Sequence, residues 1–89
     1  MRPIKTVFYS SHFGKAFKKL QVSLQSEVVK KEAIFRRDCF DSKLRTHKLK
    51  GKNQDLWSFS VTQKHRVVFR FIFDDTVLFI DIGDHSIYQ

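Results

Sequence analysis

Histidine, arginine and tyrosine side chains are the groups in this chain that could carry out chemistry. RNA can be cleaved without a metal ion. A base takes the proton of a 2′-hydroxyl, cations stabilise the charged phosphorane, and an acid protonates the leaving 5′-oxygen. The residues that could supply these groups are His47, Arg66, His85 and Tyr88. Each residue also has an interpretation without catalysis. His47 could be an exposed loop histidine and Arg66 part of a structural ion pair, while His85 could be a tail residue and Tyr88 a packed ring.

A basic stretch surrounds His47 and is the second candidate feature. Its side chains could contact phosphates, although runs of charge are usually solvated loops. Only Asp41 and Asp55 are near enough in sequence to neutralise it, which favours phosphate contact. We expect RNA to be bound by Lys43, Arg45, Lys48, Lys50, Lys52 and Arg70. Trp57 could stack on an unpaired base or belong to the core.

The charge of the chain is polarised. There are 17 Lys and Arg residues against nine Asp and Glu, a net charge of +8. All 17 basic residues and five acids lie in residues 1–70, which therefore carry +12, whereas residues 71–89 carry four acids and no Lys or Arg. A domain with this excess of positive charge attracts polyanions, which include nucleic acid, an acidic membrane surface and an acidic protein.

Length and motif content limit the remaining possibilities. The 89 residues suffice for a single domain, 1–89, with one small core. Cys39 is the only cysteine, so no internal disulfide can form and a reducing compartment fits. No apolar run resembles a signal peptide or a membrane span, and we expect a cytoplasmic protein that binds no membrane. Phosphate loops, zinc signatures and nucleophile elbows are absent from the sequence, so we predict no metal and no cofactor.

The hydrophobic pattern predicts two helices between a first strand and three later ones. Ile4–Tyr9 reads as a strand, and Ser10 or Ser11 can cap a helix with an apolar stripe at Phe13, Ala16, Phe17 and Leu20. A second helix is predicted over Leu24–Arg37, with Ser26 as a possible cap and a buried side formed by Val28, Val29, Ala33 and Phe35.

The second half reads as a connector followed by three strands. Asp38–Asp55 has no clean period and is expected to be extended and solvent-facing, and the strands are Leu56–Thr62, His65–Phe73 and Thr76–Gly83. The fold class is therefore α+β, in the order β-α-α-β-β-β, with a helical hairpin packed on a mainly antiparallel four-stranded sheet.

The last hairpin allows a register to be predicted. If Phe73 pairs with Thr76, Val68 lies opposite Asp81 and Arg66 opposite Gly83. One face would then carry Arg66, Val68, Arg70 and Asp81, and the other Val67, Phe69, Phe71, Leu78 and Ile80. Asp81 could form a structural ion pair with the arginines, or hold one of them in an anion site. Surface ion pairs are common, so the first interpretation is the simpler one.

Several stretches resemble the YoeB and YafQ branches of the RelE/ParE toxin superfamily. The first is His47-Lys-Leu-Lys-Gly, followed by Leu56-Trp-Ser-Phe-Ser-Val-Thr-Gln-Lys-His-Arg-Val-Val-Phe. The second is the ending Asp81-Ile-Gly-Asp-His-Ser-Ile-Tyr, which is similar to the glycine–x–histidine ending of YafQ-like toxins. The predicted order of elements is also that of the superfamily.

The resemblance implies a type II toxin that cleaves mRNA in the ribosomal A site without a metal and is silenced by a cognate antitoxin protein. By position, Arg66 matches the phosphate-stabilising arginine, His85 the C-terminal acid or base, and His47 a histidine in the basic loop. Tyr88 resembles the terminal aromatic residue. These four side chains are then expected to lie within one phosphate group's reach of each other.

Two departures from the family pattern keep alternatives open. YoeB-like toxins place a glutamate base where this chain has Lys43, and YafQ-like toxins have an arginine where it has Asp81. His47 or His85 would then have to act as the base, and Arg70 could replace the lost cation. The alternatives are a ParE-like toxin that inhibits DNA gyrase by binding, and a non-enzymatic RNA-binding module derived from a toxin. We also expect an acidic antitoxin segment to mask the basic face, including His47 and Arg66.

Overall fold

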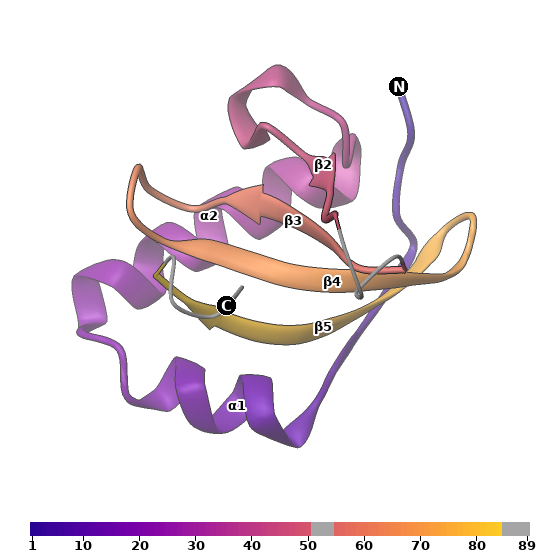
Figure 1. The fold of residues 1–89 in the computed structure, drawn as a ribbon. Coiled ribbons are helices and arrows are strands. Elements are labelled where there is room, and N and C mark those ends of the chain that lie inside the picture. Colours follow the sequence, from indigo (N-terminus) through magenta and orange to yellow (C-terminus); the bar gives the residue numbers. More distant parts are fainter. Residues whose placement is uncertain (51–54, 85–89) are drawn as a thin grey trace.

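The chain forms a five-stranded sheet with two helices packed against it (Figure 1). The structure is a computed structural model and describes residues 1–50 and 55–84. Its elements are β1 (Thr6–Tyr9), α1 (Ser11–Lys18), α2 (Val22–Arg37), the short 3₁₀ helix η1 (Ser42–Leu44), β2 (His47–Lys48), β3 (Trp57–Ser60), β4 (Arg66–Phe73) and β5 (Thr76–Gly83). No helix in the described part of the chain is both long and apolar enough to cross a membrane.

The predicted α+β class and order of elements are confirmed, with one strand more than expected. The strands lie in the order β1-β5-β4-β3-β2, with β1 parallel to β5 and the other neighbours antiparallel. The additional strand is β2, in the stretch predicted to be a solvent-facing connector. That prediction was wrong in part, because Cys39 and Leu44 are fully buried there. The two apolar side chains draw the segment onto the core, and the Asp41 side chain caps η1 by accepting from the Lys43 amide at 2.9 Å.

A side-chain cap marks the start of α1, whereas Gln21 makes no side-chain capping hydrogen bond at the start of α2. Of the two predicted candidates, Ser10 and Ser11, it is Ser10 that caps α1. Its hydroxyl oxygen accepts from the Phe13 amide at 2.9 Å, and the hydroxyl donates to the Ile80 carbonyl of β5 at 2.8 Å. Helix α2 begins earlier than predicted, after Gln21, so Ser26 lies inside the helix and is not a cap.

The buried side of α2 is narrower than predicted. Val28 and Phe35 are buried, but Val29 is 60% exposed and Ala33 is exposed too. The reason is geometric: successive residues turn by 100° around a helix, so a stripe through Val28 and Phe35 turns Val29 away from the sheet.

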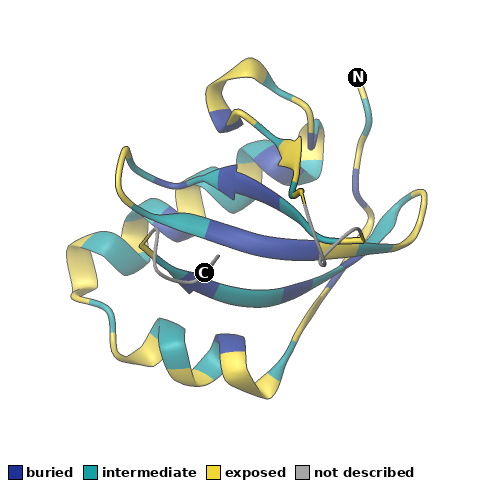
Figure 2. Ribbon diagram, viewed as in Figure 1, coloured by how far each residue is buried: buried dark blue, intermediate teal, exposed yellow. Residues whose placement is uncertain are grey.

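The core is built from phenylalanine rings where α2 crosses the sheet, which is the buried band of Figure 2. The Phe35 ring centroid lies 4.8 Å from that of Phe59, 4.9 Å from Phe69 and 5.4 Å from Phe79, and all four side chains are fully buried. Phe13 joins α1 to this cluster at 5.5 Å from Phe79. The helices therefore cover the sheet face that carries these rings, and the opposite face is left without a helix.

The predicted register of the last hairpin is confirmed at both ends and wrong in the middle. Phe73 pairs with Thr76, Val68 with Asp81 and Arg66 with Gly83. Between these pairs lie two irregularities, one between Phe71 and Phe73 and one between Val68 and Phe69, which shift the register and then restore it. When the pairing register shifts by one residue, side chains that pointed to one face of the sheet point to the other. The residues of β5 on the core face are therefore Val77, Phe79 and Ile82, not Leu78 and Ile80.

Candidate nucleic-acid interface

Four basic side chains, from α2, from η1 with its C-cap and from β4, meet in a cleft at the end of the β3–β4 hairpin. The cleft has a volume of about 210 Å³. It is lined by Lys31, Lys43, Arg45, Ser60, Val61, Thr62, Gln63 and Arg66. We call it the basic cleft. Among the described residues, β2 pairs with Trp57 and Ser58 and extends no further along β3, so the edge of β3 beyond Ser58 faces the cleft. Cations and hydroxyl groups converging on one hollow suit a phosphate group.

The β3–β4 turn holds Arg66 in place. Its Nη1 donates to the carbonyl oxygens of Thr62 at 2.8 Å, Gln63 at 3.1 Å and His65 at 3.3 Å. The Thr62 hydroxyl in turn accepts from the amides of Lys64 and His65, at 3.2 and 3.1 Å, which closes the turn. Among the described residues, Nε and Nη2 of Arg66 have no hydrogen-bond partner and can serve an anion.

Arg45 connects the basic cleft to His47. It adopts the left-handed conformation (φ 51°), the one non-glycine residue to do so in the described ranges, at a cost of about 1 kcal/mol. The reversal brings its carbonyl oxygen to 2.9 Å from Nδ1 of His47. A carbonyl oxygen only accepts, so Nδ1 carries the proton and neutral His47 has its lone pair on Nε2. That nitrogen belongs to an exposed ring and can accept a proton from a substrate.

His47 and Arg66 lie on the same face of the sheet, the face without helices. His47 pairs with Ser58, Ser58 with Val68, and Ser60 with Arg66, so the two residues are two strands and two residues apart. With strands about 4.8 Å apart and residues about 3.3 Å apart, their Cα atoms are separated by about 12 Å. Long side chains on this face can approach one ribonucleotide from two sides, although the Arg66 guanidinium here turns toward its own hairpin.

The other predicted residues are spread over the molecule. Lys48 and Trp57 form one pair of the sheet, on the helix-covered face. Trp57 packs against the rings of Phe40 and Phe71 at 5.7 and 5.4 Å, which makes it part of a surface aromatic cluster. Arg70 is exposed on the same sheet face as Arg66, four residues further along β4. Lys50 is exposed beyond β2. His85, Tyr88 and Lys52 lie outside the described residues.

Asp81 has a different partner from the one expected. Its carboxylate lies 3.2 Å from Nε2 of His12 and accepts from the Ile82 amide at 2.8 Å. Neither predicted role is therefore seen in the described part of the chain, since no ion pair there joins Asp81 to Arg66 or Arg70. Helix α1, which carries His12, packs against β5 and supplies the closer partner for the Asp81 carboxylate.

Lys31 is the cleft residue that the sequence reasoning missed. Leu24, Val28, Lys31 and Phe35 follow the spacing of one apolar helix stripe, and a lysine on such a stripe must extend its ammonium group to the rim. That spacing was the available signal. The Lys31 side chain is 24% exposed and reaches Glu27 at 3.3 Å, and this hydrogen bond lowers the pKa of Glu27. Lys43 and Arg45 make no ion pair with a described residue, so the basic cleft keeps a positive charge.

The fold is shared with several toxins of known structure, although sequence comparison finds no relative. No protein-family model and no curated protein matches the sequence. The toxin–antitoxin complex RelBE2 of Mycobacterium tuberculosis contains a chain that superimposes with a TM-score of 0.79 at 15% identity, over 97% of both chains. A YoeB/ParE toxin of Agrobacterium tumefaciens gives 0.76 at 16% identity, over 91% of this chain and 99% of its own.

A third structure, the DinJ–YafQ toxin–antitoxin complex of Escherichia coli, gives a TM-score of 0.74 at 14% identity, over 98% of this chain and 97% of the matched chain. The resemblance to RelE/ParE toxins drawn from the sequence motifs is thus confirmed at the level of the fold. At such identities a shared fold does not carry an activity with it.

Proposed function

We propose that this chain is the toxin of a type II toxin–antitoxin pair and that it cleaves mRNA on the ribosome without a metal ion. The observation that carries the proposal is the basic cleft beside His47. The toxin fold, the cluster of Lys31, Lys43, Arg45 and Arg66, and an exposed histidine with a defined tautomer occur together on one small domain.

In the proposed reaction each group has a part that its chemistry allows. Nε2 of His47 accepts the proton of the 2′-hydroxyl, which then attacks the adjacent phosphorus and displaces the 5′-oxygen. Arg66 and the lysines of the basic cleft stabilise the negative charge that grows on the phosphorane. His85 and Tyr88, the residues predicted to supply the acid, lie outside the described residues and keep that role as a prediction. The 2′,3′-cyclic phosphate and a free 5′-hydroxyl are the products.

Lys43 takes a different part from the glutamate base expected at its position in YoeB-like toxins. Its ammonium group lines the basic cleft and cannot remove a proton while charged, so it contributes to phosphate binding. Base catalysis then depends on His47, whose Nδ1 is held by the Arg45 carbonyl. The departure from the family pattern thus changes which residue is the base and adds a cation to the cleft.

An antitoxin partner is part of the proposal. Two of the similar structures are complexes of a toxin with its antitoxin, RelBE2 and DinJ–YafQ. The excess of positive charge on residues 1–70 favours an acidic partner segment over the basic cleft. A complex that left both His47 and Arg66 exposed to solvent would contradict this part of the proposal.

The test is to induce the chain in growing bacteria and map mRNA 5′ ends on translating ribosomes. Wild type should arrest growth and produce new cuts within codons. His47→Ala should reduce cutting by about 10²-fold or more, the usual contribution of a general base. Lys5→Gln, an exposed substitution away from the cleft, is the control and should cut as wild type does.

A His85→Ala variant tests the residue that the sequence motif alone selects. Loss of cutting in both histidine variants supports an acid–base pair, whereas loss in His85→Ala alone removes His47 from the proposed mechanism. Growth arrest without cuts would indicate a gyrase-directed toxin, and no arrest would indicate an RNA-binding module; either result overturns the nuclease proposal.

A further inference from the structure

A cluster of partly exposed aromatic side chains lies at the end of the sheet opposite the basic cleft. It consists of Phe40 after α2, Trp57 in β3 and Phe71 in β4, with the guanidinium group of Arg2 over two of the rings. We call it the aromatic cluster. In Figure 1 the N-terminal segment and the β4–β5 turn lie at this end of the sheet, and the β3–β4 turn, which borders the basic cleft, lies at the other.

The three rings of the aromatic cluster are held in a fixed arrangement. The Trp57 ring stands edge-on to both phenylalanine rings, with centroids 5.7 Å from Phe40 and 5.4 Å from Phe71. The planes of the two phenylalanine rings are inclined by 29°, with centroids 6.3 Å apart. Aromatic pairs at these distances stabilise each other. A ligand that stacks on the cluster therefore meets rings that are already ordered, which lowers the entropic cost of binding.

Hydrogen bonds of the N-terminal segment hold the aromatic cluster together. The Asp38 carboxylate accepts from the backbone amides of Arg2 and Phe40, both at 3.0 Å. The Arg2 guanidinium carbon lies 4.2 Å from the ring centroid of Phe71 and 5.7 Å from that of Phe40. Its Nε donates to the Asp74 carbonyl at 3.1 Å, and its Nη2 lies 3.8 Å from the Asp74 carboxylate. Both carboxylates beside the cluster therefore already have partners.

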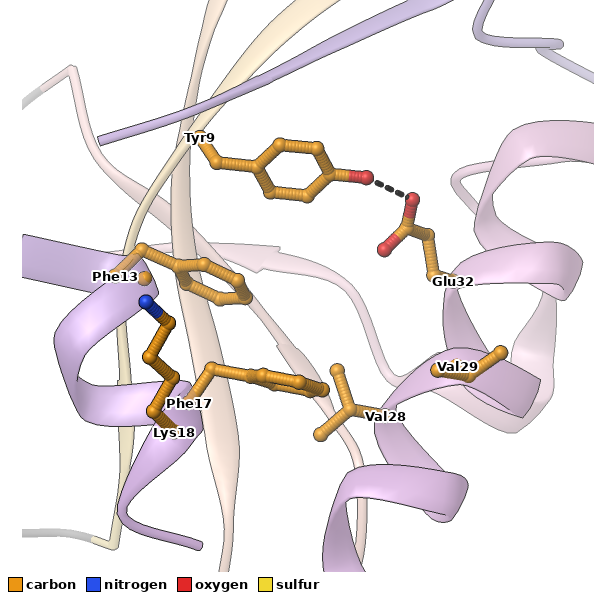
Figure 3. Close-up of a pocket in the computed structure, with 8 residues that line it drawn as sticks. Tyr9, Phe13, Phe17, Lys18, Val28, Val29 and Glu32 are labelled. Carbon is orange, nitrogen blue, oxygen red and sulfur yellow. Dashed lines mark hydrogen bonds between the residues drawn. The ribbon is translucent and has the colours of Figure 1, made fainter. Parts of the chain in front are cut away.

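Phe40 is the ring most open to another molecule, since it is 42% exposed whereas Trp57 and Phe71 are half-buried. The cluster is separate from the hollow between α1 and α2, where the rings of Phe13 and Phe17 approach α2 (Figure 3), because none of its residues lines that hollow. An aromatic ring that is both fixed and exposed offers a flat surface on which an unpaired base can stack.

The segment that joins the aromatic cluster to the basic cleft is positive. Lys43, Arg45, Lys48 and Lys50 are exposed along η1 and β2, and Lys48 pairs with Trp57 in the sheet. None of these four cations forms an ion pair with a described residue. Aromatic rings for bases and unneutralised cations for phosphates are the two components of a site for single-stranded nucleic acid.

The spacing allows one RNA strand to contact both surfaces. Trp57 and Ser60 are three residues apart on β3, or about 10 Å, and Phe71 and Arg66 are five residues apart on β4, or about 16 Å. At about 3.4 Å per nucleotide of a stacked strand, the longer distance corresponds to about five nucleotides. A strand of six nucleotides therefore reaches from the basic cleft to the aromatic cluster, whereas a dinucleotide occupies only one of them.

We propose that the aromatic cluster stacks an unpaired base of the same RNA strand whose phosphates enter the basic cleft. Phe40 presents the exposed ring, and Trp57 and Phe71 support it. The proposal rests on the RNA binding at the basic cleft that the proposed function includes, but it does not require cleavage. It adds a second contact to the RNA interface, several nucleotides away from the phosphate in the cleft.

The first experiment uses Trp57, the only tryptophan of the chain, as a fluorescent probe of the cluster. The full chain is titrated with a hexamer of 2′-O-methyluridine, which lacks the attacking 2′-hydroxyl and cannot be cleaved, and with the matching dimer; calorimetry measures binding of both. We expect the hexamer to bind more tightly and to quench Trp57, and the dimer to bind without quenching. Equal quenching by the two, or hexamer binding without quenching, would overturn the proposal.

A second experiment compares two ring-to-leucine variants. Phe40→Leu removes the stacking ring but keeps an apolar side chain. It should weaken hexamer binding at least fivefold, the lower end of what one stacked base contributes, and leave dimer binding unchanged. Phe8→Leu is the control, because Phe8 is 53% exposed on β1, at the opposite edge of the sheet, and this variant should bind as wild type does. Melting temperatures establish that both variants fold, and equal weakening in the two would contradict the proposal.

Failure of this proposal is distinguishable from failure of the proposed function. If dimer and hexamer bind equally tightly and Phe40→Leu matches wild type, RNA binding at the basic cleft stands and the stacking site is refuted. If neither RNA binds, the whole RNA interface is refuted. A shift of Trp57 emission with anionic phosphatidylserine vesicles, or with protein concentration alone, and no response to RNA would assign the cluster to a membrane surface or to a second copy of the chain.

Discussion

The basic cleft leads to a quantitative prediction about RNA binding. Each phosphate that a protein contacts on single-stranded nucleic acid releases counterions and contributes about 0.7 to the slope of log affinity against log salt. Four cations line the cleft, which gives a contribution of about −2.8 to the slope. Between about 50 and 200 mM salt, a fourfold change, this part of the affinity should fall about 50-fold.

The perturbation is the triple variant Lys31→Gln, Lys43→Gln and Arg45→Gln. This variant keeps Arg66 and its hydrogen bonds to the β3–β4 turn. Removing three of the four cations should reduce the magnitude of the slope by about 2. Between about 50 and 200 mM salt, the part of the RNA affinity that the cleft contributes should then fall only about 2.6-fold. The assay is fluorescence anisotropy of a labelled single-stranded RNA titrated with the purified chain at several salt concentrations. Cations outside the cleft add equally to both slopes and cancel in the difference.

The matched control removes the same charge from α1. Lys15→Gln, Lys18→Gln and Lys19→Gln also lower the net charge by three but lie away from the basic cleft. This variant should lose less than half as much slope as the cleft variant. If both triple variants flatten the slope equally, RNA binding reflects the overall charge of the chain, and the basic cleft is not the interface.

Three further predictions concern the fold that supports the site. Phe35→Ala removes the ring shared by three strands and should cost about 3–5 kcal/mol of unfolding free energy, a large part of the total for a domain of this size; urea denaturation measures it, and a loss below about 1 kcal/mol would contradict the packing described. Two backbone amides donate to the Asp38 carboxylate and lower its pKa from 3.8, so the stability it adds is present above pH 3.8 and is lost as pH falls through the folded pKa. Asp38→Asn should therefore be less stable than wild type near neutral pH and equal to it in strong acid, and parallel stability curves down to acid pH would refute this. Burial raises the pKa of the Cys39 thiol, so it should react with a disulfide reagent only at the rate of unfolding; rapid labelling of native protein would show that the segment opens.

Much of the fold could be predicted from patterns among residues that are near one another in sequence. The bounds of β5, the cap at Ser10 and the pairing of Arg66 with Gly83 were predicted because alternation and turn spacing act within a few residues. The basic stretch and the exposed His47 were likewise visible as composition. The motifs around them pointed to the toxin fold that the similar structures share.

The tertiary structure decided which of these residues meet. Two compensating register shifts in the last hairpin turn the side chains in the middle of β5 to the opposite face of the sheet from the one predicted. Such bulges cannot be located from the alternation of apolar and polar residues. Lys31, 35 residues before Arg66 in sequence, enters the basic cleft because α2 crosses the sheet at that point. The sequence by itself determined the supply of cations and the order of elements, since these depend on composition and short-range periodicity. Packing between distant segments chose the four cations that share one cleft. The contact that sets the tautomer of His47 is local, since the Arg45 carbonyl is two residues away, but it depends on a left-handed backbone at Arg45 that the sequence pattern does not indicate.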